Sequence, residues 1–228
     1  MWDESKHPRD SRGRFIDRWG VIQKLWLHED DGYIIQSVYD GDEYASLEEQ
    51  QARVVEITKI TDNAIDRVPV VKIPGYTEEE CEFIADQHKE LLRYARDNND
   101  NKEVAFVFRQ GFSERIIVRG ADDNIDFNQI LLNKGSGLVV LHNHPRNKSF
   151  SLADLSTFIR SDNIHIMTIV KNNGIVETLV KNEGFNRNQS ATRLNRIHKK
   201  YNQKGTTQEQ EKICAKFLEG ENDITWTR

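Results

Sequence analysis

Two histidines, a serine and an aspartate lie within one short stretch, LHNHPRNKSFSLADL, at residues 141–155. In an extended chain the side chains alternate between two sides, so His142 and His144 point the same way, with Cα atoms roughly 6.6 Å apart. A proline then ends the strand, and Ser151 begins a helix that carries Asp154 on its first turn, from which a carboxylate can reach back toward the imidazoles. Two imidazoles and one carboxylate form the ligand set of a catalytic zinc site, with the fourth tetrahedral position open to water.

Each part of this stretch also has a purely structural explanation. Ser151 and Asp154 match a helix capping box, and an isolated His-x-His at a strand end is more often structural than catalytic. The combination favours a metal site, because the histidines follow GLVVL, an apolar strand, at its carboxyl-terminal edge, where α/β folds place functional residues. The remaining histidines lack such neighbours, and we expect them at the surface or in the core: His7, His28, His88, His165 and His198.

The elements around the motif predict an α/β domain over residues 73–183. Thr77 and Glu80 form a capping box before apolar residues at helical spacing, which predicts an amphipathic helix that ends in the run DNNDN. We expect the other elements of the domain to be strands at 103–108, 115–118, 137–141, 165–171 and 174–181, and helices at 125–135 and from Ser151 onward. Residues 1–72 lack a sustained period and are interpreted as an N-terminal region of low order. Residues 184–228 are interpreted as a tail with helices at about 187–203 and 207–219.

The composition excludes several classes of protein. The chain has 228 residues and a formal net charge of -5, which fits a soluble protein of one or two small domains. No apolar stretch approaches the roughly 20 residues of a membrane-spanning helix, and the start, MWDESKHPRDSRGRF, is too charged for a secretory signal. The only cysteines, Cys81 and Cys214, are far apart in the sequence, so we expect neither a disulfide framework nor a thiolate zinc cluster.

The string HNHP followed by Ser-x-x-Asp resembles the signature of the JAMM (JAB1/MPN/Mov34) metalloenzymes: His-x-His, about ten residues, then Asp, with a serine three residues before the Asp. The asparagine and the proline make it similar to the bacterial RadC branch, and the resemblance extends over the order of elements in residues 73–183. It implies an MPN-like (cytidine-deaminase-like) three-layer α/β fold with a mixed sheet, and Zn²⁺ bound by His142, His144 and Asp154. Here nine residues separate His144 from Asp154, and Arg146-Asn147 stand where RadC-type loops carry Ser-Gly.

The resemblance also implies a glutamate at the start of the strand after the first helix, which contacts the attacking water without binding the metal. Glu103 opens the strand EVAFVF and is the better match, and Glu114 in the following turn is the second candidate; an ordinary solvated strand start is the structural alternative for Glu103. Zinc lowers the pKa of its water to about 7, Glu103 would accept the proton and return it to the leaving amine, and Ser151 would donate a hydrogen bond to the oxyanion.

Together these residues predict a zinc-dependent peptide or isopeptide hydrolase that acts on protein or peptide substrates. A metal-dependent nuclease or toxin domain is the alternative from another enzyme class. The motif disfavours it, because no further His or Asn stands at nuclease spacing, and the mild acidity argues weakly against a nucleic-acid partner. A catalytically inactive JAMM-fold binding or assembly module is the third alternative, although no metal ligand is missing from the motif.

The N-terminal string WDESKHPRDSRGRF is weakly similar, in composition, to segments of phage head and morphogenesis-associated proteins. This similarity suggests a phage or mobile-element product that contacts a phage structural partner through its N-terminal region. We therefore expect a cytoplasmic or virion-associated protein with no membrane partner.

Overall fold

The computed structural model describes residues 21–28, 32–39, 56–112, 114–120, 125, 136–202 and 206–228, and at 21–28 and 32–39 only the backbone. Six strands form a mixed sheet: β3 (Val104–Phe108), β4 (Arg115–Arg119), β5 (Leu138–His144), β6 (Ile164–Lys171), β7 (Val176–Lys181) and β8 (Ile224–Thr227). Two further strands, β1 (Val21–His28) and β2 (Gly32–Tyr39), extend it beside β4, which gives the order β1-β2-β4-β3-β5-β6-β7-β8. Neighbours are antiparallel except for the pairs β2–β4 and β5–β6.

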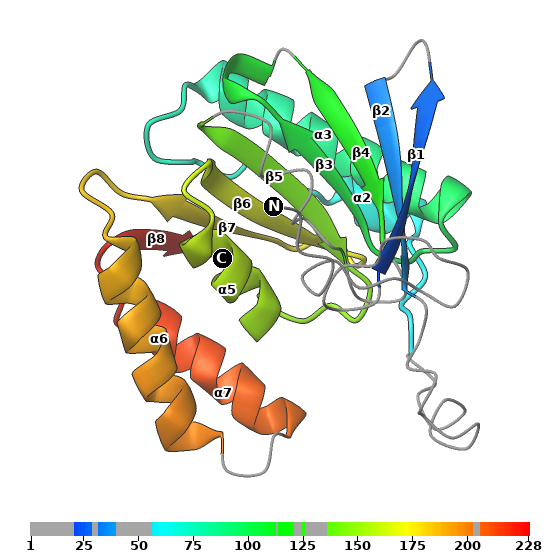
Figure 1. Ribbon diagram of the computed structural model, residues 1–228. Coiled ribbons are helices and arrows are strands. Elements are labelled where there is room, and N and C mark those ends of the chain that lie inside the picture. The colour runs from blue at the N-terminus through cyan, green and yellow to red at the C-terminus, as the bar shows by residue number, and fades with distance from the viewer. Residues whose placement is uncertain are drawn as a thin grey trace, which may run out of the picture.

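Helices cover both faces of the sheet, as Figure 1 shows. One face carries α2 (Asp62–Asp66) and α3 (Glu78–Asn98). The other carries α5 (Leu152–Arg160), α6 (Arg187–Tyr201) and α7 (Thr207–Leu218). The α/β class and the mixed sheet that the sequence predicted are thereby confirmed.

The alternation of side chains along the strands divides the interior into two cores. On β5, Leu138 and Val140 point into the core under α5, α6 and α7. Val139 and Leu141 point into the core under α3. A strand that buries both of its faces has to be apolar almost throughout, which explains the continuous run GLVVL.

Among the described helices, three begin with a capping box: the N-cap hydroxyl accepts the backbone N–H three residues on, and the carboxylate there accepts the N-cap N–H. The pairs are Thr77 with Glu80, Ser151 with Asp154, and Thr206 with Glu209. The first two were predicted from the sequence. The second fixes the direction of the Asp154 side chain and so belongs to the site described below.

Two parts of the chain join the domain in ways that the sequence pattern did not predict. Ile60, Ile65 and Val68 are buried in the core under α3, although they belong to the region interpreted as having low order. At the other end, β8 pairs with β7, and Leu194 and Phe217 of α6 and α7 are buried in the core under α5. The helices expected at about 187–203 and 207–219 are confirmed, and they pack on the sheet.

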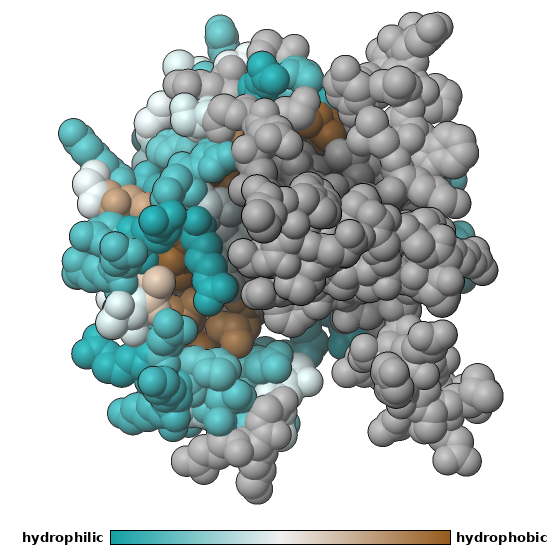
Figure 2. Space-filling view, in the orientation of Figure 1, coloured by the Kyte–Doolittle hydropathy of each residue, from teal (hydrophilic) through white to brown (hydrophobic). Residues whose placement is uncertain are grey.

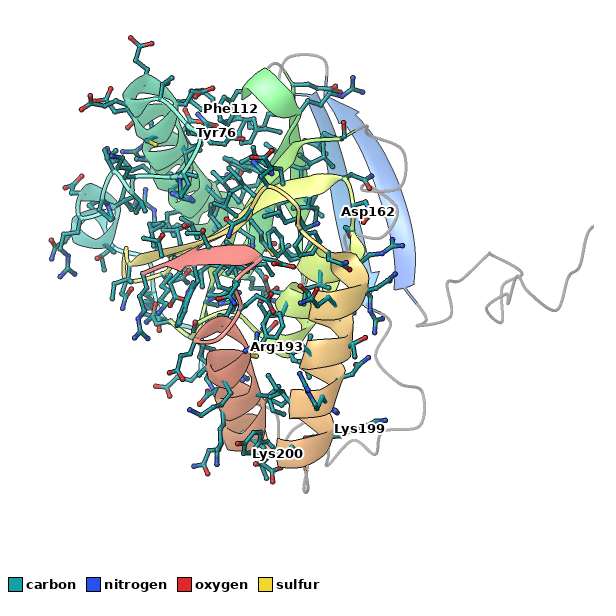
Figure 3. All side chains as sticks on the ribbon, turned by 90° about the vertical axis from the view of Figure 1, so that its left-hand side faces the viewer. Tyr76, Phe112, Asp162, Arg193, Lys199 and Lys200 are labelled. Atoms are coloured by element: carbon teal, nitrogen blue, oxygen red, sulfur yellow. The ribbon has the colours of Figure 1, made fainter. Side chains whose placement is uncertain are left out.

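The helices α6 and α7 are linked through Arg193, which lies between them in Figure 3. Its Nη1 donates to the carbonyl of Phe217 and to Glu221, each at 2.8 Å. Lys199 and Lys200 lie at the far end of α6, away from the sheet. Among the described residues, no helix is both long and apolar enough to cross a bilayer.

Candidate metal centre

The predicted ligands His142 and His144 lie at the carboxyl end of β5, which runs between β3 and β6. Because β5 is extended through both residues, their side chains share the face that is covered by α5. Ala105 of β3 pairs with His142, which places Glu103, two residues earlier on the same face, beside the histidines. The side chains of His142 and Glu103 are 0% and 5% exposed.

Asp154 reaches the same point from α5. Its Oδ1 lies 3.4 Å from Nε2 of His142, and its Oδ2 lies 3.4 Å from Nε2 of His144. Oδ2 also accepts the backbone N–H of Ser151 at 2.7 Å. The helix cap therefore holds the carboxylate where it faces both imidazoles.

The spacing of these donors fits a zinc ion. The two Nε2 atoms lie 3.1 Å apart, and the carboxylate oxygens are 3.4 Å from them. Four ligands at 2.0–2.1 Å from a tetrahedral zinc ion lie about 3.3 Å from one another. Nitrogen and oxygen donors are also a set that zinc accepts, so the residues present are suited to hold it.

Of the two candidate glutamates, only Glu103 lies at this site. Its Oε1 is 3.9 Å from Nε2 of His142, and Glu103, His142 and His144 each offer a donor atom within 4.8 Å of the others. Such a buried group could bind a metal ion. Glu114 lies at the other end of β3 and β4, where it forms an ion pair with Arg109 at 2.9 Å.

The charges of the site act on each other strongly because all of its groups are buried. Burial lowers the pKa of His142. Burial also disfavours the charged form of His144, but hydrogen bonding and the charge of Asp154, with the charge of Glu103, outweigh it and raise the pKa of His144 to about 9. Burial opposes ionisation of Asp154 as well, yet the two imidazoles keep its pKa well below the usual range. The carboxylate is therefore ionised at neutral pH, as a metal ligand has to be.

A pocket of about 220 Å³ opens at the site. Its walls are the loop after β5, the first turns of α5 and one stripe of α7 formed by Thr207, Gln210, Glu211 and Cys214. Lys148 from the loop and Glu211 from α7 form an ion pair of 2.6 Å at this pocket. Figure 2 shows hydrophobic side chains gathered where α5 meets α6 and α7, bordered by hydrophilic ones. Burial, followed by the charge of Asp154, raises the pKa of the Cys214 thiol to about 12, so the pocket contains no thiolate nucleophile at Cys214.

The loop between the ligands orients one of them. Nδ1 of His144 lies 3.0 Å from the carbonyl oxygen of Lys148, which can only accept a hydrogen bond. When a bound metal displaces the proton on Nε2, this contact keeps the remaining proton on Nδ1 and leaves Nε2 as the ligand. The next residue, Ser149, donates to Oε2 of Glu177 at 2.6 Å, and Trp226 of β8 donates to the same oxygen at 3.1 Å. Nothing in the sequence pattern indicated these contacts of Lys148, Glu177 and Trp226.

The other described histidines lie apart from the pocket that opens at the site. His88 on α3 is buried and lies 2.7 Å from the hydroxyl of Thr168, and burial together with the nearby His142 lowers its pKa to about 3. The ring of His165 stacks on Tyr76 at 6.4 Å, and His198 lines a groove between α5 and α6. His7, the side chain of His28, the N-terminal string similar to phage proteins and most of the helix expected at 125–135 lie outside the described residues.

Comparisons of the chain with protein families, with curated proteins and with solved structures found no match. The interpretation of the site therefore depends on the residues and on their geometry.

Proposed function

We propose that the protein is a zinc-dependent hydrolase of the JAMM type that cleaves a peptide or isopeptide bond. The observation that carries the proposal is the convergence of His142, His144 and Asp154 at tetrahedral spacing, with the carboxylate of Glu103 just beyond that spacing at 3.9 Å. The helices on both faces of a mixed sheet are consistent with an MPN-like three-layer fold. The string HNHP followed by Ser-x-x-Asp resembles the motif of RadC-like sequences.

In this proposal His142, His144 and Asp154 would hold a zinc ion, which would supply a water molecule with a pKa of about 7 and a Lewis acid for the scissile carbonyl. Glu103 accepts the proton of the attacking water and returns it to the leaving amine. Its burial keeps bulk water away from that proton transfer. Ser151 lines the pocket at the start of α5, and its hydroxyl donates a hydrogen bond to the oxyanion of the substrate.

The test is a digestion of a peptide library and of isopeptide-linked substrates at matched zinc loading, with and without a chelator. Glu103→Gln keeps the size of the side chain but removes the base, so it should retain zinc and lose about 10²–10⁴-fold in rate. Asp154→Asn should weaken zinc binding, because it removes the charged ligand. Full activity of Glu103→Gln would refute the mechanism.

A parallel digestion of DNA and RNA, with and without the chelator, distinguishes the two alternatives. Chelator-sensitive cleavage of DNA or RNA, without cleavage of peptides, would identify a nuclease. Zinc binding without any hydrolysis would identify a binding or assembly module. Docking on a phage structural partner would use the N-terminal region, residues 1–72, and binding of the full chain to virion proteins would test it.

A further inference from the structure

Asn143 stands between the two histidines, and its side chain lies on the opposite face of β5. It is fully buried. Its Oδ1 accepts the backbone N–H of Val104 at 2.8 Å, and its Nδ2 donates to the carbonyl of Lys102 at 3.2 Å. One side-chain amide therefore binds the peptide groups on both sides of Glu103.

These contacts bind a part of the chain that precedes the β3–β5 pairing. The pairing between β3 and β5 begins at Ala105 with His142, so Glu103 lies before the first paired residue. The carbonyl of Glu103 is held from the other side, by the N–H of Gly120 and by Nδ2 of Asn99, each at 2.9 Å. The amide of Asn143 supplies the contacts on the side of β5.

A second asparagine fixes the first. Asn172 accepts from Nδ2 of Asn143 at 2.8 Å, and its own Nδ2 donates to the carbonyls of Thr58 at 2.7 Å and Asn101 at 3.0 Å. Its backbone N–H donates to the carbonyl of His144 at 3.3 Å. The same network thus connects the end of β5 with the segment that leads into Glu103.

We propose that Asn143 is a positioning residue that holds Glu103 against the two imidazoles. This inference rests on the proposed role of Glu103 as the base. The position requires a group that donates and accepts in one plane, and asparagine provides both. Aspartate would only accept, and it would set its second oxygen against the carbonyl of Lys102. If Asn143 only stabilised the fold, it would bind the same backbone groups. Its replacement would then lower the activity equally with and without the Glu103 carboxylate.

A double-mutant cycle separates the two roles. Asn143→Asp and Asn143→Ala are each made in the wild-type chain and in Glu103→Gln, and hydrolysis is measured at equal zinc loading. In the wild-type chain kcat should fall about 10–100-fold with little change in KM, as is usual for residues that orient a metal site. In the Glu103→Gln chain the same substitutions should change kcat less than about threefold. Equal losses in both backgrounds would overturn the proposal.

A matched control is Asn182→Asp. Nδ2 of Asn182 donates to the carbonyl of Asn222 at 2.8 Å, and its Oδ1 accepts from Thr225 at 2.8 Å. Asn182 follows β7, Asn222 precedes β8 and Thr225 lies in β8, so this group is at the edge of the sheet away from β3 and Glu103. This variant also loses a donor, so its stability should fall, but its kcat should stay within about twofold of the wild-type value.

Crystal structures of the Asn143 variants provide a readout that does not depend on activity. Glu103 should turn away from the imidazoles, beyond its 3.9 Å separation from His142, while His142, His144 and Asp154 keep their places. An unmoved Glu103 in both variants would overturn the positioning role. If the wild-type chain cleaves no peptide, the proposed function fails, and these structures still decide whether Asn143 positions Glu103.

Discussion

Replacing Ser151 by alanine separates its function as a helix cap from its proposed function in catalysis. The Oγ of Ser151 accepts the backbone N–H of Asp154 at 3.1 Å, and removal of such a cap costs about 1 kcal/mol of stability. For a domain of this size that loss lowers Tm by about 2–4 °C. The Ser151 backbone N–H still donates to Asp154 at 2.7 Å, so the carboxylate should stay in place and zinc should stay bound.

The matched control is Thr77→Ala, which removes the same kind of cap from α3. The hydroxyl of Thr77 accepts the N–H of Glu80 at 3.2 Å, so the stability loss should be similar. Loss of an oxyanion donor, in contrast, lowers kcat by about 10²–10³-fold. We therefore expect equal melting temperatures and zinc contents for the two variants, but a large fall in kcat for Ser151→Ala alone. Ser151→Thr keeps both the cap and the hydroxyl and should recover most of the activity.

Differential scanning calorimetry, elemental analysis and peptide hydrolysis on one set of samples measure all three quantities. Equal activity in Ser151→Ala and Thr77→Ala would show that Ser151 is only a cap. A loss of zinc from Ser151→Ala would show instead that the hydroxyl helps to hold Asp154 in place.

Three further predictions concern the ligands and the core. Protein purified without added metal should contain one zinc per chain by elemental analysis. The double variant His142→Ala, His144→Ala should contain none, and full zinc occupancy in that variant would exclude the site. Ile65 is 1% exposed and Val70 is 55% exposed, so in urea unfolding Ile65→Ala should cost about 2–5 kcal/mol and Val70→Ala far less. Equal costs would show that the residues before α3 do not belong to the core. Burial lowers the pKa of Lys181 to about 8, below its ordinary value of 10.5. The charged lysine therefore destabilises the folded state below pH 8, and this destabilisation decreases as the pH rises from 8 to 10.5. The wild-type chain should gain stability relative to Lys181→Met between pH 8 and 10.5, and an unchanged difference would contradict the argument.

Local signals in the sequence were sufficient for most of the elements. The capping boxes at Thr77 and Ser151 marked two helix starts, and the apolar run before His142 marked the central strand. The turn at 172–174 marked the hairpin of β6 and β7. In contrast, β8 has only four residues and is held by pairing with β7, a partner that is distant in the sequence. A pattern read along the chain contains no information on such pairing.

The candidate site was predictable to the extent that its residues are close in sequence. His142 and His144 share a face because of the period of an extended strand, and Asp154 faces them because of its helix cap. The position of Glu103 beside the histidines depends on the register between β3 and β5. Periodicity does not give this register, and the family resemblance implied only a glutamate at the start of the strand. The contacts of Asn143 with Lys102 and Val104 were beyond prediction, because they join residues about forty positions apart in sequence.

The nine residues between His144 and Asp154 form a loop that is held by side-chain hydrogen bonds at its turn. Asn147 adopts a left-handed backbone with φ 56°, which asparagine tolerates better than most residues. Its side chain donates to Thr58 and accepts the N–H of Asn173, both at 2.9 Å. The strand places the imidazoles and the cap of α5 places the carboxylate, so the loop only has to span the distance between them. The turn around Asn147 is thus held on both sides, and each oxygen of Asp154 lies 3.4 Å from its histidine.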